Sequence, residues 1–221
     1  MKKSFAVIGL GRFGGAIACE LAASGQEVLA MDSSKDRINE FMNITSHAVV
    51  GNAQDETTLK QLGIRNFDVV VIAIGEDIQA SILVTLMIKE MGVKYVLAKA
   101  QNDYHARVLE KLGADLVVHP ESDMGIRAAH QLISNNLIEF LELSDKFSIG
   151  EIKLINSKLS DHTLAELDLT NQYKVNVTAI RRANGEVEFP TATTIVHEED
   201  SVLVVGRTVD VEYFDEHTAS K

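Results

Sequence analysis

The chain has 221 residues, of which 46% are hydrophobic, which suits one large domain or a medium domain followed by a small one. Its formal net charge of −11 argues against a nucleic-acid partner and against docking on anionic lipid, because both need a basic face. Its one cysteine, Cys19, excludes an internal disulfide framework and a thiolate-rich metal site, and the lack of a signal-peptide pattern or a long apolar run predicts a cytoplasmic protein.

The first expected element is a buried strand over residues 5–8, which stops at a glycine and is followed at once by a helical pattern. The turn carries the spacing G-x-G-x-x-G at Gly9, Gly11 and Gly14. The first glycine permits the turn, the second lets the backbone approach a pyrophosphate, and the third lets the helix lie close to the strand. The free N–H groups and the positive dipole end of the helix then face the phosphates, so we predict a nucleotide site.

A second apolar run, residues 27–31, ends at Asp32. A carboxylate at this distance from the glycines accepts hydrogen bonds from ribose hydroxyls and repels a 2′-phosphate, which disfavours the NADP class. The alternative is that Asp32 is a helix N-cap or a turn residue before residues 33–35, and both roles can hold together. Arg12 lies inside the glycine loop. Its guanidinium group either makes a bidentate contact with phosphate oxygens or is solvated in the first helical turn. We expect Phe13 and Ser33 at the same site.

Strands and helices alternate along the chain as far as residue 118. This alternation predicts an α/β fold with a Rossmann-like, doubly wound parallel sheet of strand order 3-2-1-4-5-6, and a ligand at the switch point beyond strands one and four. After the first two strands, we expect strands over 48–50, 67–74, 96–100 and 116–118, and helices over 36–42, from 55 or 57 onward, 77–91 and 103–112.

Residues that directly follow the carboxyl ends of the strands should also face the ligand. Lys99 would place a positive charge near phosphates, or would simply face water. Asp55 and Glu76 would orient a metal or a ribose, or would cap the helices that follow them. The full set of strand-end candidates is Asn52, Ala53, Asp55, Ala73, Ile74, Gly75, Glu76 and Lys99.

Pro120 marks the end of the first fold, and a long helix is expected from there to about Leu143. Its apolar face needs a partner, either the second domain or another subunit. The residues that recur at helical spacing are Ile126, Ala129, His130, Ile133, Leu137, Phe140 and Leu141. We therefore expect a nucleotide-binding domain over 1–120, a linking or crossover helix over 121–143 and a small α+β domain over 144–221.

The last stretch is expected to hold short strands and little helix. Residues 183–185, Ala-Asn-Gly, predict a hairpin turn. The strands are expected over 151–155, 175–180, 187–189 and 202–205, with one short helix over 163–167. A domain of this size is near the lower limit for folding alone, so dimerisation through it would help.

The sequence offers a nucleotide site without an obvious reaction. The seven histidines are scattered with no metal-ligand spacing, and no nucleophile-elbow, zinc-protease or Walker pattern appears. A dehydrogenase would need a substrate-binding domain and a proton-transfer residue placed against the nicotinamide. A regulatory protein without catalysis is therefore favoured, and the alternative is an NAD(H)-dependent oxidoreductase with an unrecognised substrate.

The whole chain resembles the cytosolic gating subunits of bacterial Ktr potassium transporters. These consist of the module that regulates potassium conductance (RCK, also called KTN or TrkA-N) and its C-terminal companion, TrkA-C. The stretches that carry the resemblance are FAVIGLGRFG at 5–14, GNAQDE at 51–56, AIGED at 73–77, KAQN at 99–102 and HPE at 119–121.

The resemblance implies a homo-octameric ring, assembled from dimers of the C-terminal domain, on the inner face of the cell membrane beneath a potassium-translocating subunit. It implies that ATP and ADP compete for one site, with ATP activating uptake and ADP closing the pore. Arg12 matches the arginine that meets the terminal phosphate, and Asp32 matches the ribose ligand. Glu121 matches an acidic residue near the nucleotide at the dimer interface, where Mg²⁺ or Ca²⁺ sits beside the phosphates.

In this family the C-terminal domain can also bind cyclic di-AMP at its dimer interface. The corresponding segment here is 169–177, and Asn176, Val177 and Pro190 are the residues implied for that site. Thr170 stands where relatives commonly carry an arginine, which implies weaker binding of cyclic di-AMP.

Overall fold

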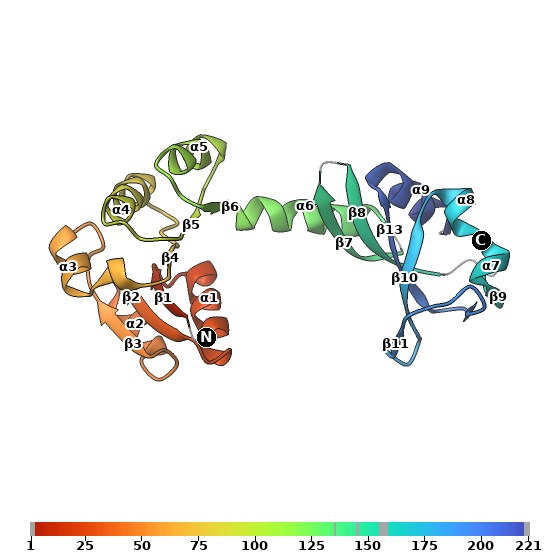
Figure 1. Cartoon of the computed structure of the whole chain (residues 1–221), viewed down its shortest axis with the longest axis horizontal. Coiled ribbons are helices and arrows are strands. Elements are labelled where there is room, and N and C mark those ends of the chain that lie inside the picture. The colour runs from red at the N-terminus through yellow and green to blue at the C-terminus, as the bar shows by residue number, and fades with distance from the viewer. Residues whose placement is uncertain (1–2, 135, 145, 155–158, 219–221) are drawn as a thin grey trace. The chain divides into compact units, whose positions relative to one another are not determined.

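The computed structural model describes residues 3–134, 136–144, 146–154 and 159–218 (Figure 1). The chain divides into two compact units, Met1–Glu121 and Ser122–Lys221, each with its own core. The nucleotide motifs all lie in the first unit.

The first unit is built on a six-stranded parallel sheet with the order β3-β2-β1-β4-β5-β6, which confirms the predicted topology. Because the order reverses between β1 and β4, their carboxyl ends leave a crevice where ligands bind in such sheets. The strands are β1 (Ser4–Ile8), β2 (Glu27–Asp32), β3 (His47–Val50), β4 (Val69–Ile72), β5 (Val96–Lys99) and β6 (Leu116–Val118).

Helices cover both faces of this sheet. Successive strand residues point to opposite faces, so Ala6 and Ile8 belong to one apolar core and Val7 to the other. The first core includes side chains of α3, α4 and α5, and the second includes side chains of α1 and α2. The helices are α1 (Arg12–Ala23), α2 (Lys35–Phe41), α3 (Glu56–Gln61), α4 (Ile78–Glu90) and α5 (Asp103–Lys111), with a 3₁₀ turn, η1 (Ile64–Asn66).

The helix α1 lies very close to the edge of the sheet because Gly9 and Gly14 have no side chains. A Cβ at Gly14 would stand 1.9 Å from the Gly9 carbonyl oxygen, so the helix touches the turn backbone directly. Gly9 has φ +92°, and a Cβ there would stand 2.8 Å from the Ala73 carbonyl oxygen just beyond β4. The two contacts place the first turn of α1 at the switch point of the sheet.

The second unit has a five-stranded antiparallel sheet with the order β11-β10-β13-β8-β7 and a separate two-stranded sheet, β12-β9. Val211 and Phe214 of α9 pack in one core with Phe140, Ile152 and Val204 of the larger sheet. The elements are β7 (Leu137–Ser144), β8 (Phe147–Lys153), β9 (His162–Thr163), α7 (Leu164–Leu167), α8 (Leu169–Tyr173), β10 (Asn176–Arg181), β11 (Val187–Glu188), β12 (Ile195–Val196), β13 (Ser201–Arg207) and α9 (Thr208–Thr218).

The long helix expected as far as Leu143 is wrong in its second half. The helix α6 (Pro120–Ile133) ends one turn before β7, which pairs antiparallel with β8. The apolar pattern of 137–143 is also compatible with a strand, in which successive side chains point to opposite faces. Phe140 is 3% exposed and the next residue, Leu141, is 51% exposed. Pairing with β8 provides hydrogen-bond partners for the backbone N–H and C=O groups of this segment. The segment is therefore a strand, although its apolar residues also have helical spacing.

Other elements of the second unit agree with expectation only in part. The hairpin turn at 183–185 is present, with the Arg182 N–H donating to the Glu186 carbonyl oxygen at 2.8 Å and Gly185 at φ +88°. The strands β9 and β12 and the helices α8 and α9 were not predicted, because they are too short or too polar to show a clear period. Ile155, expected to end a strand, lies outside the described residues.

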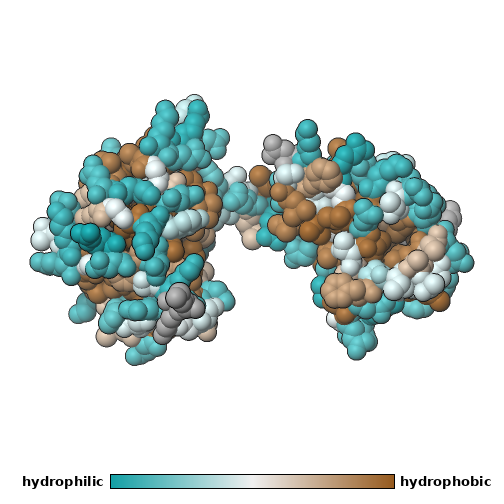
Figure 2. All heavy atoms as spheres, viewed as in Figure 1, coloured by the Kyte–Doolittle hydropathy of each residue, from teal (hydrophilic) through white to brown (hydrophobic). Residues whose placement is uncertain are grey.

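Large apolar side chains are exposed on the second unit. Figure 2 shows a brown area where Figure 1 places β7 and β8. Leu141, Leu143 and Phe147 of these strands are each half exposed, and Ile133 at the end of α6 is 82% exposed. Apolar patches of this kind mark contact surfaces. Within the described ranges, no helix is long and apolar enough to cross a membrane.

Replacing Gly14 should destabilise the first unit. Gly14→Ala forces a methyl group against the Gly9 carbonyl oxygen, so we expect the free energy of unfolding to fall by about 3 kcal/mol. Gly11→Ala is the matched control, because a Cβ there meets nothing within 4 Å, and its effect should be about 1 kcal/mol or less. Urea denaturation of the two full-length variants, followed by circular dichroism, measures the difference; equal stabilities would contradict the close helix packing.

Candidate functional site

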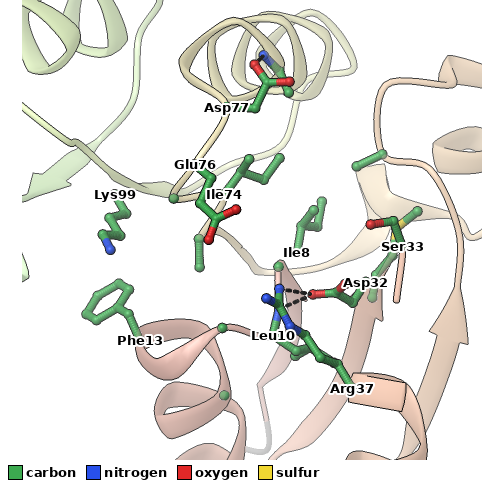
Figure 3. Close-up of a pocket in the computed structure, with 18 of the residues that line it drawn as sticks. Ile8, Leu10, Phe13, Asp32, Ser33, Arg37, Ile74, Glu76, Asp77 and Lys99 are labelled. Atoms are coloured by element: carbon green, nitrogen blue, oxygen red, sulfur yellow. Dashed lines mark hydrogen bonds and ion pairs between the residues drawn. The ribbon is translucent and has the colours of Figure 1, made fainter. Parts of the chain in front are cut away.

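A pocket of about 960 Å³ opens at the carboxyl ends of β1, β2, β4 and β5, within the first unit. Figure 3 shows Phe13, Glu76 and Lys99 on one side of it and Asp32, Ser33 and Arg37 on the other. The structure brings together most of the residues expected at the nucleotide site. Those that line the pocket are Gly9, Gly11, Arg12, Phe13, Asp32, Ser33, Asn52, Ala53, Ala73, Ile74, Gly75, Glu76, Lys99 and Glu121.

Gly14 and Asp55 do not line the pocket. Gly14 was expected to line the site, but it lies where α1 packs against the turn after β1. Asp55 caps α3 by accepting the Thr57 N–H at 3.0 Å, as the alternative interpretation predicted. Glu76 lines the pocket and does not cap α4, because the capping residue is Asp77.

The helix α1 begins in the pocket without a capping side chain. Its N-cap residue is Gly11, which makes no side-chain hydrogen bond, whereas α2, α3, α4 and α5 are all capped by an acidic, amide or hydroxyl side chain. The N–H groups of the first turn of α1 therefore have no acceptor inside the helix. A Cβ at Gly11 would meet nothing within 4 Å, so there is room beside these donors. This is the geometry of an anion site at a helix N-terminus.

Asp32 lies at the opposite side of the pocket and is 6% exposed. Its Oδ2 accepts the Leu10 N–H at 2.7 Å, and its Oδ1 accepts the Ser34 N–H at 2.8 Å. Oδ1 keeps a free lone pair, which can accept a hydrogen bond from a hydroxyl group. Of the two alternatives for Asp32, the helix cap is wrong, because Ser34 is the N-cap of α2, whereas the hydrogen bond to the Ser34 N–H agrees with a turn residue.

Arg37, which the sequence analysis did not predict at the site, reaches Asp32 from α2. Its Nη1 lies 3.3 Å from Asp32 Oδ2, and its side chain is 49% exposed. Figure 3 shows Arg37 and the Leu10 backbone converging on the same carboxylate. A signal was present, because a residue in the first turn of a helix that follows a strand lies close to that strand's end. Other unpredicted lining residues include Ile8, Leu10, Met31, Glu40, Phe41, Gln54, Asp77 and Ala80.

Two cationic side chains lie on the α1 side of the pocket. Lys99 is only 12% exposed and pairs with Glu121, Nζ to Oε1 at 2.5 Å, so the alternative that it simply faces water is wrong. The hydrogen bond from Lys99 holds the pKa of Glu121 below its ordinary value, with a smaller contribution from Arg12. Arg12 is exposed, and within the described parts of the chain no ion pair restrains its guanidinium. Arg12 and Lys99 together can attract phosphate.

The residues proposed for a second ligand lie in the second unit. Asn176 and Val177 begin β10, and Pro190 follows β11 by two residues. The Thr170 hydroxyl donates to Asn176 Oδ1 at 3.2 Å. The pocket of the first unit includes none of these residues.

The described residues hold no ready metal site, since no three histidine, cysteine or acidic side chains are grouped for one. A divalent cation beside Glu121 would therefore need most of its oxygen ligands from a bound phosphate or from another copy of the chain.

Removing the Lys99 cation should raise the pKa of Glu121 towards its ordinary value. A carboxyl group with a lowered pKa stabilises the fold above its ordinary pKa, and this contribution is lost as the pH falls through the lowered value. In Lys99→Met this contribution should be largely absent, because the folded pKa of Glu121 then lies close to the unfolded one. Lys111→Met removes an exposed cation elsewhere in the first unit and should leave Glu121 unchanged. An NMR titration of the Glu121 carboxyl carbon measures both; identical titration curves in the two variants would contradict the pair.

Two different domain families match the two parts of the chain. The TrkA-N domain family matches residues 5–120, and the TrkA-C domain family matches residues 149–218. The chain is 52% identical to Ktr system potassium uptake protein C of Bacillus subtilis over 97% of each chain. It is 42% identical to Ktr system potassium uptake protein A of the same organism over 96% of each chain, and 42% identical to that of Vibrio alginolyticus over 92% of each.

Solved structures share the fold at low sequence identity. The GsuK RCK domain superposes over the whole of this chain with a TM-score of 0.68 at 12% identity. The GsuK channel bound to NAD gives 0.69, also at 12% identity. This chain spans less than half of those chains, 48% and 40% of their length. The two domain matches and the full-length relatives identify the chain as a member of the TrkA-N/TrkA-C family of Ktr-system potassium uptake proteins, the regulatory subunits that its motifs resemble.

Proposed function

We propose that this chain is the nucleotide-responsive gating subunit of a potassium uptake system, acting from the cytoplasmic side on a membrane potassium-translocating subunit. The observation that carries the proposal is the uncapped N-terminus of α1, which faces a pocket whose other side is the carboxylate of Asp32. The relatives named as Ktr potassium uptake proteins support the potassium system.

The ligand we propose is ATP or ADP. The ribose hydroxyls donate to Asp32, in part replacing its contact with Arg37, and the phosphates lie over Gly11 against the first N–H groups of α1. Arg12 and Lys99 meet the outer phosphates. One charge-assisted contact to a γ-phosphate, which ADP lacks, is worth about 1.5–3 kcal/mol. A ligand shifts a conformational equilibrium only by such a difference, so ATP and ADP can favour different states of the assembly.

A divalent cation, Mg²⁺ or Ca²⁺, is proposed beside the phosphates with Glu121 as a ligand. Carboxylate and phosphate oxygens are the ligands these ions prefer. Glu121 now pairs with Lys99, so binding of the cation requires that Lys99 turn to the phosphate instead.

The regulatory function fits the pocket better than the alternative, an NAD(H)-dependent oxidoreductase. Hydride transfer needs a proton-transfer group against the nicotinamide; the described lining residues include no histidine, cysteine or tyrosine, Lys99 is paired with Glu121, and Asp77 caps α4. The GsuK structure with NAD shows only that a protein of this fold takes a dinucleotide. We therefore propose a regulatory subunit without catalysis.

The assembly we propose is a homo-octameric ring built from dimers of the C-terminal domain. The exposed apolar side chains of α6, β7 and β8, such as Leu132, Leu141 and Phe147, support self-association because a lone chain would leave them in water. The helix α6 has no buried side chain of its own. We also propose that cyclic di-AMP binds at Asn176, Val177 and Pro190 with low affinity, because Thr170 offers a hydroxyl group where a cation would bind phosphate.

Titration calorimetry with ATP, ADP and NADH tests the nucleotide site. We expect ATP and ADP to compete with each other and to displace NADH. Arg12→Ala should narrow the preference for ATP over ADP by about tenfold or more, because it removes the contact to the γ-phosphate.

Arg65→Ala is the matched control, since it removes an exposed arginine of the first unit that does not line the pocket. An unchanged ratio of ATP to ADP affinity in Arg12→Ala would contradict the role of Arg12. NADH binding more tightly than both nucleotides would favour the oxidoreductase.

The oligomeric state is a separate test. Size-exclusion chromatography with light scattering should give the mass of a large oligomer at micromolar concentration, because the apolar surfaces of α6, β7 and β8 are covered only in an assembly. A monomer under these conditions would contradict the ring.

A further inference from the structure

The second unit contains a cavity of about 400 Å³ between the end of α6, β7 and α9. Its volume lies in the range of small-molecule sites. Apolar side chains from three elements form its walls: Ile133 of α6, Leu137 and Phe140 of β7, and Val211 of α9. Two contacts fix the end of α6 against β7 beside the cavity. The ring of His130 stacks on that of Phe140 with 4.6 Å between their centroids, and Gln131 Nε2 donates to the Ile138 carbonyl oxygen at 2.8 Å.

A buried carboxylate lies in this apolar wall. Asp215 of α9 is 9% exposed, and its Oδ1 is buried without a hydrogen-bond partner in the part of the chain that the structure describes. Burial raises the pKa of Asp215, and the Ser134 hydroxyl at the cavity edge opposes that rise. A buried acceptor without a donor is costly, and proteins retain one chiefly where a ligand or a function uses it.

The charged side chains that line the cavity are mostly acidic. Glu212 and Glu216 line it together with Asp215, in the last turns of α9. Negative charge is unfavourable at a helix C-terminus, and like charges four residues apart repel. Among the described residues that line the cavity there is no lysine or arginine, and His130 is its one basic side chain. A cation in the cavity would relieve both repulsions.

We propose that this cavity is a binding site for a small organic cation, with an ammonium head against Asp215 and an apolar body between Phe140, Leu137 and Val211. A metal ion fits less well, because no three acidic, histidine or cysteine side chains of the described residues are grouped for one and the walls are hydrocarbon. A neutral apolar ligand would leave Asp215 Oδ1 without a donor. The site shares no residue with the nucleotide pocket.

Titration calorimetry of the full chain in sodium phosphate buffer, free of Tris, tests the proposal with n-butylammonium chloride as the probe and n-butanol as its neutral counterpart. We expect saturable binding of butylammonium, at least about tenfold tighter than that of butanol, because the ammonium group adds the attraction between opposite charges to a hydrogen bond that the butanol hydroxyl group can also donate. Asp215→Asn should weaken butylammonium binding by about tenfold or more. Glu198→Gln makes the same charge change at an exposed position away from the cavity and should have no effect.

A second variant keeps the test valid if Asp215→Asn does not fold. Glu212→Gln with Glu216→Gln changes only exposed side chains of α9 and should weaken butylammonium binding by at least about threefold through the lost attraction. The proposal is overturned if butylammonium gives no saturable heat, if butanol binds as well as butylammonium, or if the double variant binds like the unchanged chain.

Discussion

The direct contact between the first turn of α1 and the backbone after β1 is the constraint on which the pocket depends. It exists because Gly14 has no side chain to separate the helix from the Gly9 carbonyl group. A larger residue would push the helix away and move its N–H groups from the crevice between β1 and β4. The same turn presents the Leu10 N–H to Asp32, so the glycine loop and the acidic residue are positioned together.

Charge is divided between the two sides of this pocket. On one side Asp32 is buried among N–H donors, and Arg37 contacts it from α2. On the other side Arg12 and Lys99 accompany the uncapped helix end, and Lys99 is occupied by Glu121. A sugar suits the acidic side and phosphates suit the basic side. The pair of Lys99 and Glu121 also gives a bound phosphate something to displace, which is how a ligand can favour one arrangement over another.

The second unit has a different construction, and its most exposed elements carry its strongest apolar surface. The helix α6 and the edge strand β7 expose Ile133 and Leu141, although Phe140 between them is fully within the core. These surfaces suit contact with further copies of the chain. The acidic cavity beside α9 adjoins these surfaces, since Ile133 also lines it, and Asp215 is the buried one of its three carboxylates.

Much of the first unit could be read from the order of its amino acids. The alternation of strands and helices predicted the sheet order, and the strands that end at Gly9 and Asp32 predicted a pocket there, because the carboxyl ends of parallel strands meet at one edge. The position of Arg37 beside Asp32 and the pairing of Lys99 with Glu121 depended on the packing of helices onto the sheet, which local spacing does not encode. For residues 137–144, helical and strand periods fit the apolar pattern almost equally, and only the partner strand β8, adjacent in the folded sheet, decided between them.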